Sequence, residues 1–126
     1  MSTSTSTHPL FVYGTLKRGG ALNSYLEGAR YRGEATIQGL LYISKEGWYP
    51  RLRPGNGTVH GELFGDVSDA LLWQLDAVEG HPYLFERRET KTQDGETVWA
   101  YWYNGDIGGI EVLPGGNFDC CKRGAQ

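Results

Sequence analysis

The chain has 126 residues, enough for one domain with its own core, and folding at this length buries about two thirds of the surface of the unfolded chain. Its formal net charge is −3, from 12 basic and 15 acidic side chains mixed along the sequence, so we expect no surface for nucleic acid or an anionic membrane. The apolar fraction of 39%, together with 19 glycines, favours short strands and turns over long helices.

The two ends of the chain carry no sign of export. The N-terminal segment MSTSTSTHP lacks the basic and apolar regions of a signal peptide, and no apolar run reaches the ~20 residues of a membrane-spanning helix. Cys120 and Cys121 are adjacent, so they close no useful disulfide loop and lack metal-ligand spacing. We therefore expect a cytoplasmic protein, with residues 1–9 as a disordered tail and residues 10–126 as a single domain.

Several extended segments are predicted in the first half of the chain. Residues 10–13 form an apolar run that ends at Gly14, and a short helix is expected over residues 21–28. The further extended segments are 34–43, 48–52 and 59–67, with Pro54 as an interruption. In the last segment Gly61 and Gly65 fall on one face, which indicates a barrel corner or a close backbone approach.

The clearest element is a helix that begins after Ser68 and ends at Gly80. Ser68 is a favourable N-cap, Gly80 is a typical helix stop, and the apolar residues between them repeat at helical spacing: Leu71, Leu72, Leu75 and Val78. The spacing places Glu79 at the C-terminus of this helix.

A hairpin follows the helix. Extended segments at residues 85–92 and 97–103 flank Asp94-Gly95, a strong signal for a tight turn. About six short strands and two helices predict an α+β domain built on a closed or nearly closed sheet.

The loop Gly14-Thr15-Leu16 is the first candidate for a binding site. Successive backbone N–H groups in such a turn can converge on a carboxylate or an oxyanion, and glycine lets the backbone come close to the ligand. The Gly-Lys-Ser/Thr ending of a phosphate-binding loop is missing. Taken alone, the more ordinary interpretation is a tight connection that binds nothing.

Glu79 is the second candidate. A carboxylate at a helix C-terminus lies against the negative end of the helix dipole, which disfavours its charged form. Burial would raise its pKa further towards neutrality, as a general acid/base requires. The ordinary alternative is a solvated glutamate before a helix-ending glycine.

The other polar residues are weaker candidates. His8, His60 and His81 lack metal-ligand spacing, so no metal site is expected. The glutamates of the hairpin, Glu86, Glu89 and Glu96, alternate with basic residues as on a solvent-facing ribbon. These residues are expected to make ordinary cross-strand pairs.

Four segments in order, FVYGTLKRGGALNSYL, GELFGDV, LDAVEGHPYLFERR and VWAYWY, make the sequence resemble the γ-glutamylcyclotransferase-like family, and most closely its short γ-glutamylamine cyclotransferase branch. The resemblance extends from about Leu10 to Tyr103. It implies a small mixed β-barrel flanked by short helices, with a cavity between the Tyr-Gly-Thr-Leu loop and a glutamate.

The same resemblance implies a reaction and its residues. Tyr13, Gly14, Thr15 and Leu16 match the loop that binds the γ-glutamyl group, and Glu79 matches the general acid/base. The α-amine of the substrate attacks its own side-chain amide, closing 5-oxoproline and releasing an amine. No metal or cofactor is required, the implied partner is a small γ-glutamyl substrate, and we expect a monomer or a weak homodimer.

Some features leave alternatives open. Lys17, Arg18 and Asn23 match the branch motif, but we expect them to lie outside the active site. Phe85-Glu86-Arg87 stands where the family commonly has Tyr-x-Arg, so a hydroxyl is lost, which Tyr83 either replaces or does not.

Two other functions also remain open. The first is a non-catalytic binding module of the same fold, for a small amino-acid-like ligand or a partner protein. The second is an enzyme that removes a γ-glutamyl protecting group in a biosynthetic pathway, with Tyr49, Pro50 and Arg51 in the pocket wall.

Overall fold

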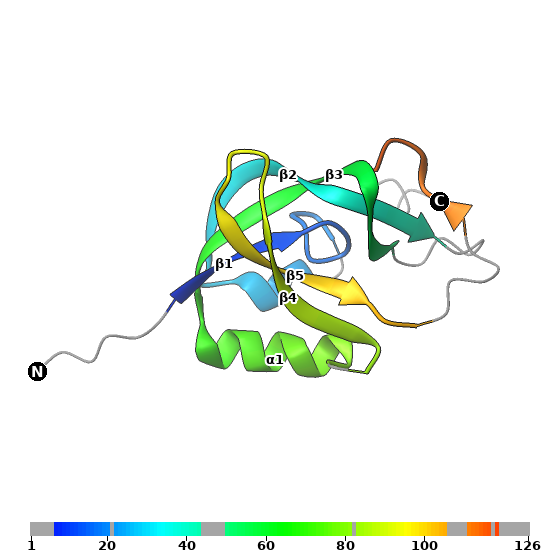
Figure 1. The fold of residues 1–126 in the computed structure, drawn as a ribbon. Coiled ribbons are helices and arrows are strands. Elements are labelled where there is room, and N and C mark those ends of the chain that lie inside the picture. Colours follow the sequence, from blue (N-terminus) through cyan, green and yellow to red (C-terminus); the bar gives the residue numbers. More distant parts are fainter. Residues whose placement is uncertain are drawn as a thin grey trace, which may run out of the picture.

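The computed structural model describes residues 7–20, 22–43, 50–81, 83–105, 111–116 and 118, which form a curled sheet with one α-helix along its side (Figure 1). The elements, in chain order, are β1 (Thr7–Val12), a 3₁₀ turn (Asn23–Leu26), β2 (Arg30–Ile43), β3 (Pro50–Ser68), α1 (Asp69–Glu79), β4 (Phe85–Lys91), β5 (Thr97–Tyr103), β6 (Glu111–Val112) and a second 3₁₀ turn (Pro114–Gly116). Cys120 and Cys121 lie outside the described residues.

Across the described ranges, six strands form one mixed sheet in the order β4-β5-β1-β3-β2-β6. β1 runs parallel to β5, and the other neighbours are antiparallel. The sheet curls until β2 meets the β4–β5 turn, where Ile37 bridges Thr92 and the Gln93 N–H donates to the Thr36 carbonyl at 2.9 Å. This curled half-barrel confirms the predicted α+β class and its mixed sheet.

The β2–β3 ribbon is longer than its sequence signals predict. β3 runs through Pro54, where the sequence predicts an interruption, because pairing with β2 extends from Arg30 opposite Gly65 to Ile43 opposite Pro50. The register shifts between Gln38 and Leu40, so the ribbon absorbs the irregular segment without ending. Residues 48 and 49 of the predicted segment 48–52 lie outside the described residues.

β1 begins at Thr7, three residues before the predicted start of the domain. Thr7 and His8 pair with Ser68 and Val67 of β3, and His8 Nε2 lies 2.6 Å from the Asp69 carboxylate. Strand pairing and this contact hold residues 7–9 in β1, although their composition predicts a disordered tail. Residues 1–6 of the predicted tail lie outside the described residues.

The helix α1 has the bounds that its capping residues predict. Ser68 Oγ accepts the Leu71 N–H at 3.1 Å, and Gly80 ends the helix with φ of 74° and ψ of 31°, in the left-handed region that favours glycine. Glu79 is therefore its last residue. In the described part of the chain, no helix is both long and apolar enough to cross a membrane.

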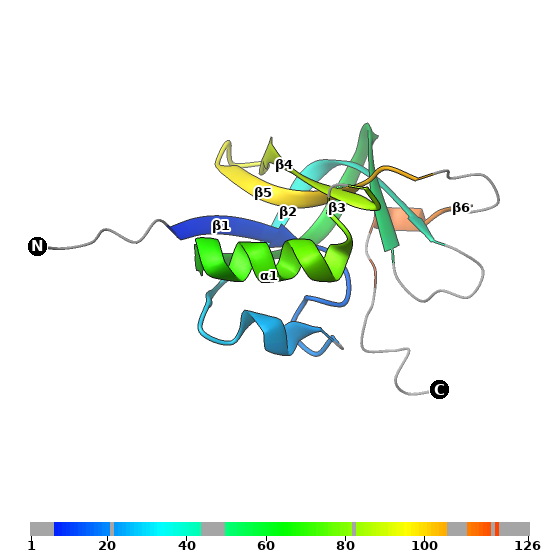
Figure 2. The same cartoon turned by 90° about the horizontal axis from the view of Figure 1, so that it is seen from below.

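Both faces of β1 are buried, in two different cores. Leu10 and Val12 pack with Leu72 and Leu75 between the sheet and α1, and Phe11 packs inside the curl. Seen from below, α1 lies along β1 beside the loop and short helical turn that follow that strand (Figure 2). As a result, the loop after β1 and the C-terminus of α1 come to the same end of the molecule.

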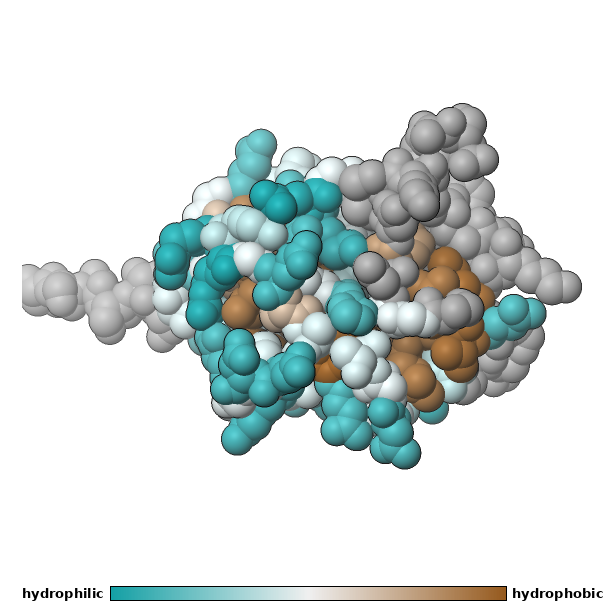
Figure 3. Space-filling model, turned by 90° about the horizontal axis from the view of Figure 1, so that it is seen from above, coloured by the Kyte–Doolittle hydropathy of each residue, from teal (hydrophilic) through white to brown (hydrophobic). Residues whose placement is uncertain are grey.

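The interior of the curl is close-packed at the glycine-marked face of β3. A side chain at Gly61 would collide with the Val12 carbonyl and the Phe11 ring, which confirms the predicted close backbone approach. The face away from α1 is mostly hydrophilic, with hydrophobic side chains gathered towards one end (Figure 3).

Candidate active site

A pocket of about 430 Å³ lies between the loop after β1 and the end of α1. We call it the Glu79 pocket, and its lining residues are Tyr13, Gly14, Thr15, Leu22, Pro50, Val78, Glu79, Leu84 and Phe85. Its volume is that of a site for a small molecule. The structure thus places four of the five residues singled out in the sequence around one cavity. The fifth, Leu16, has its side chain in the core beside α1.

The loop after β1 holds its carbonyl groups in internal hydrogen bonds. The Gly14 carbonyl accepts the Lys17 N–H at 3.0 Å, the Thr15 carbonyl accepts the Leu22 N–H at 2.9 Å, and the Leu16 carbonyl accepts the Asn23 side-chain amide at 2.9 Å. Among the described residues, the N–H groups of Gly14, Thr15 and Leu16 donate to no acceptor. The loop is therefore rigid and keeps three consecutive donors available for a ligand.

Gly14 is required where the loop approaches the start of β3. A Cβ atom at this position would lie 2.9 Å from Cγ and 3.0 Å from Cδ of Pro50, which forms part of the opposite wall. Glycine therefore sets the width of the pocket at this point. Arg51, the next residue, does not line the pocket, and its guanidinium lies 5.2 Å from the centre of the Tyr103 ring.

The Glu79 carboxyl group is partly buried against the apolar wall. Within the described residues it makes no hydrogen bond and no ion pair. Burial raises its pKa from the ordinary value of 4.5 to about 7, because the charged form loses hydration without gaining a partner. Such a group exchanges a proton readily near neutral pH.

Tyr13 lines the pocket together with the loop residues Gly14 and Thr15 and with Glu79. Its hydroxyl donates to the Tyr101 carbonyl at 2.6 Å, so the phenol proton is already used in a hydrogen bond to β5. Burial and the nearby Glu79 carboxylate both raise the pKa of Tyr13 well above its usual value. Tyr13 is therefore neutral, and it shapes the pocket without supplying a titrating group.

A hydrogen-bonded network fixes the last turn of α1 to the hairpin. Arg87 of β4 donates to both oxygens of Asp76, at 2.8 and 3.0 Å, and the Tyr101 hydroxyl donates to the same carboxylate at 2.7 Å. Asp76 and Glu79 are three residues apart, so they lie on neighbouring turns of the helix. The network therefore fixes the position of the helix turn that leads to Glu79.

The pKa values of the two carboxyl groups at this helix end are shifted in opposite directions. Burial opposes ionisation of Asp76, but the hydrogen bonds from Arg87 and Tyr101 outweigh it and lower the pKa of Asp76. Sequence reasoning did not predict that Asp76, Arg87 and Tyr101 form a network. The helical spacing of Asp76 and Glu79 was a usable signal, but the partners on the hairpin come together only in the folded chain.

Phe85 fills the place of the missing hydroxyl with an apolar surface. Its ring lines the pocket and packs edge-on against Tyr103, with ring centres 5.3 Å apart. Tyr83 does not replace the hydroxyl, because its side chain is 88% exposed and does not line the pocket. That wall is therefore apolar.

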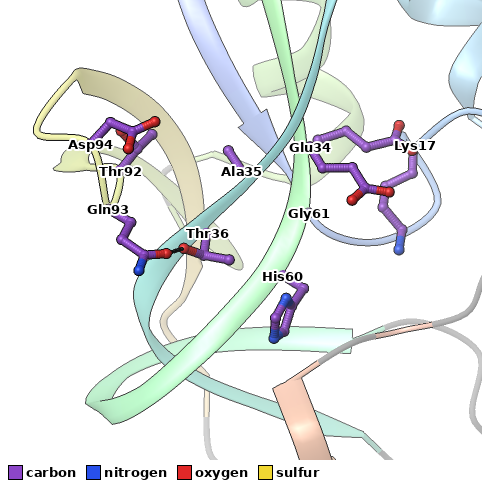
Figure 4. Close-up of a pocket in the computed structure, with 10 residues that line it drawn as sticks. Lys17, Glu34, Ala35, Thr36, His60, Gly61, Thr92, Gln93 and Asp94 are labelled. Atoms are coloured by element: carbon purple, nitrogen blue, oxygen red, sulfur yellow. Dashed lines mark hydrogen bonds between the residues drawn. The ribbon is translucent and has the colours of Figure 1, made fainter.

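A second cavity, which we call the polar hollow, lies on β2, β3 and the β4–β5 turn (Figure 4). It measures about 290 Å³, and Thr36 and Gln93 are hydrogen-bonded across it at 2.5 Å. Glu62 in this hollow accepts the Arg18 N–H at 2.8 Å. In the part of the chain that is described, no three His, Cys, Asp or Glu side chains are placed to hold a metal ion. Glu34 and Asp94 also line this hollow but are exposed, so its partly buried carboxyl group is that of Glu62, which has a partner.

The three additional motif residues lie around the loop and outside the Glu79 pocket, as expected. Lys17 donates to the Phe118 carbonyl at 2.6 Å, and the Arg18 guanidinium stacks 3.7 Å from the centre of the Tyr31 ring. Asn23 braces the loop through the Leu16 carbonyl. Its contribution is therefore to the shape of the binding loop.

Comparisons with known proteins agree with this architecture. A model of the family described as gamma-glutamyl cyclotransferase, AIG2-like, matches residues 10–120. A gamma-glutamylcyclotransferase family protein of Citrobacter rodentium is 33% identical over 109 residues, which cover 86% of this chain and 93% of that protein. The crystal structure of an AIG2-like protein from Mus musculus has a TM-score of 0.76 at 26% identity, covering 90% of this chain and 88% of that one. A Pyrococcus horikoshii protein shares the fold, with a TM-score of 0.76 at 24% identity over 94% of this chain and 95% of that one.

Proposed function

Because the chain belongs to the gamma-glutamyl cyclotransferase, AIG2-like family, we propose that it cyclises a γ-glutamyl amine or γ-glutamyl amino acid to 5-oxoproline and releases the free amine. One observation carries this proposal. A carboxyl group with a pKa of about 7 shares a single pocket with Gly14 and Thr15, which belong to a loop with three consecutive backbone donors available. These are the two groups that such a cyclisation needs.

The reaction is a rearrangement within one substrate molecule. The α-amine nitrogen forms a bond to the γ-carbonyl carbon, and the bond from that carbon to the leaving nitrogen breaks. Two protons pass from the α-ammonium nitrogen to the leaving nitrogen, which departs as an ammonium group, so no water or other reactant enters. The main task of the protein is to fold the glutamyl chain into an attacking geometry, which supplies several kcal/mol of the barrier reduction or more.

Glu79 is the proton carrier in this mechanism. Its carboxylate accepts a proton from the α-ammonium group, returns it to the departing nitrogen, and carries the second proton, lost by the ring nitrogen after attack, in the same way. A pKa near neutrality suits both transfers, and a positioned acid/base of this kind typically accelerates a reaction by about 10²–10⁴-fold. The Asp76–Arg87–Tyr101 network holds the carboxyl group in place for both steps.

The loop amides form the positive pole of the site. Among the described lining residues there is no lysine, arginine or histidine, so the backbone N–H groups of the loop and the Thr15 hydroxyl are donors available to an anion. In the proposed complex, the amides of Gly14, Thr15 and Leu16 bind the α-carboxylate of the substrate or the oxyanion that develops at the γ-carbonyl. Assignment to the γ-glutamylamine branch belongs to the same proposal.

Measurement of 5-oxoproline released from a panel of γ-glutamyl amides, γ-glutamyl-ε-lysine among them, tests the proposal. We expect release from at least one member, and loss of release in Glu79→Gln. Thermal stabilisation by the amides without any 5-oxoproline would favour the binding-module alternative, since ligand binding alone raises apparent stability. Full activity of Glu79→Gln would overturn the assigned acid/base.

A further inference from the structure

We infer that the amine released by this protein carries an apolar group and no charged group besides its own amino group, so that it is not an amino acid or a diamine. The inference rests on the proposed cyclotransferase function and concerns the part of the Glu79 pocket that the glutamyl unit leaves unfilled. The pocket has two polar poles, the Glu79 carboxyl group and the N–H groups of the Gly14–Leu16 loop. The inference is based on the difference between these poles and the remaining wall.

The polar poles are matched by the glutamyl unit itself. The α-ammonium group faces the carboxyl group of Glu79, and an anionic oxygen of the substrate takes the N–H groups of the Gly14–Leu16 loop. Tyr13 has no donor left, since its hydroxyl already binds the Tyr101 carbonyl. The Thr15 hydroxyl is the polar side chain that remains, so a second charge, on the leaving group, would find no opposite charge of its own among the described lining residues.

The rest of the wall is hydrocarbon. It consists of the side chains of Leu22, Pro50, Val78, Leu84 and Phe85. A carboxylate on the leaving amine would lose hydration against this wall without meeting a cation, and an ammonium group would compete with the substrate's own ammonium for Glu79. Burial of an unpaired charge is unfavourable, so both kinds of leaving group are selected against.

Two of the wall residues also stand open to solvent at the pocket. Val78 is 38% exposed and Leu84 is 43% exposed, although both are large and apolar. Exposed apolar side chains beside a cavity are typical of a surface that a ligand covers. An alkyl or aryl leaving group removes this surface from water, and each additional buried methylene is expected to raise kcat/KM by about fourfold.

Matched substrate pairs test the inference with the wild-type protein. γ-Glutamyl-isopentylamide and γ-glutamyl-leucine share one carbon skeleton and differ by a carboxylate. γ-Glutamyl-n-pentylamide and mono-γ-glutamyl-putrescine have equal chain length and differ by an ammonium group. We expect kcat/KM for 5-oxoproline release to be at least about tenfold higher for the uncharged member of each pair.

A charge placed on the wall sharpens the test. Leu84→Arg supplies a cation at the pocket and is expected to reduce or reverse the preference for the isopentylamide over γ-glutamyl-leucine. Trp73→Arg is the matched control, because Trp73 is 70% exposed on α1 and does not line the pocket. The control should keep the wild-type ratio.

The outcomes separate the inference from the function on which it rests. Release of 5-oxoproline with equal or higher kcat/KM for the charged members overturns the apolar leaving group and leaves the cyclotransferase function standing. Absence of 5-oxoproline from all four amides overturns the proposed function, and the inference falls with it. A preference for the uncharged members that Leu84→Arg reduces and Trp73→Arg does not supports the inference.

Discussion

The Glu79 pocket and the polar hollow each contain one partly buried glutamate, and these two glutamates differ in the partners that they have. Glu62 in the polar hollow accepts a backbone hydrogen bond and lies 3.9 Å from the Arg18 Nε. Glu79 meets an apolar wall, has no such partner among the described residues, and has its pKa raised to about 7. Glu79 is distinguished by the absence, among the described residues, of hydrogen-bond and ion-pair partners that would stabilise its charged form.

Replacement of each glutamate by glutamine tests this difference most directly. Glu79→Gln removes the proton carrier, and we expect kcat for 5-oxoproline release to fall by about 10²–10⁴-fold. Glu62→Gln changes a carboxylate outside the Glu79 pocket, and kcat should stay within about twofold of wild type, because the glutamine oxygen can still accept the Arg18 N–H. Equal losses in the two variants would contradict the assignment of the active site.

A second contrast concerns two arginine–carboxylate pairs. Arg87 and Asp76 have side chains 15% and 14% exposed, whereas Arg32 and Glu96, which are also doubly hydrogen-bonded, are 31% and 36% exposed. We expect Arg87→Leu to lower the free energy of unfolding by about 3 kcal/mol, because it leaves Asp76 with an uncompensated buried charge. Arg32→Leu should cost less than about 1 kcal/mol.

Urea unfolding of both arginine variants measures this difference. The network also predicts that Arg87→Leu lowers kcat more than it raises KM, because it releases the turn that holds Glu79 and leaves the loop amides in place. Equal stability losses, or a change confined to KM, would remove Arg87 from its positioning role.

The raised pKa of Glu79 makes a prediction about stability. A folded-state pKa of about 7 against 4.5 means that the folded chain holds this proton more tightly than the unfolded chain. The associated stability is complete below about pH 4.5 and is lost as the pH rises to about 7. Glu79→Gln should therefore be about 2 kcal/mol more stable than wild type at pH 8, after allowance for partial exposure, and nearly equal to it at pH 4.

Unfolding curves of the two proteins at pH 4, 6 and 8 provide the measurement. A difference that grows with pH supports a buried, unpartnered carboxyl group. A constant difference, or one that shrinks as the pH rises, would show that Glu79 has an ordinary pKa.

The smallest expected effect lies at the narrow point of the Glu79 pocket. Gly14→Ala places a methyl group about 3 Å from the Pro50 ring, so the wall must move. We expect KM to rise several-fold with a stability loss of about 1 kcal/mol. Adding Pro50→Ala should recover much of the KM, and failure of this rescue would mean that the two residues do not set the width of the pocket together.

Local signals in the sequence were sufficient for α1 and for the position of Glu79. Ser68 and Gly80 cap the helix as predicted, and Gly95 takes a φ of 88° in the predicted hairpin turn. These features depend on residues within a few positions of each other, so one sequence is enough to identify them. The resemblance then joined the loop after β1 with Glu79, and the two do line one pocket.

Features that depend on distant pairing could not be predicted in the same way. β3 continues through Pro54 because β2 supplies a partner, and β1 extends back to Thr7 because the end of β3 does the same. The partners of Asp76 come from two strands of the hairpin, 11 and 25 residues away. Local propensity contains no information on such contacts, which decide how the acid/base is held.

A crystal structure with 5-oxoproline bound tests the central claim most directly. The account predicts the ring in the Glu79 pocket, with its carboxylate or carbonyl oxygen on the N–H groups of Gly14 to Leu16 and its ring nitrogen towards the Glu79 carboxyl group. Binding of 5-oxoproline in the polar hollow, or in the Glu79 pocket without contact to the loop amides, would contradict it.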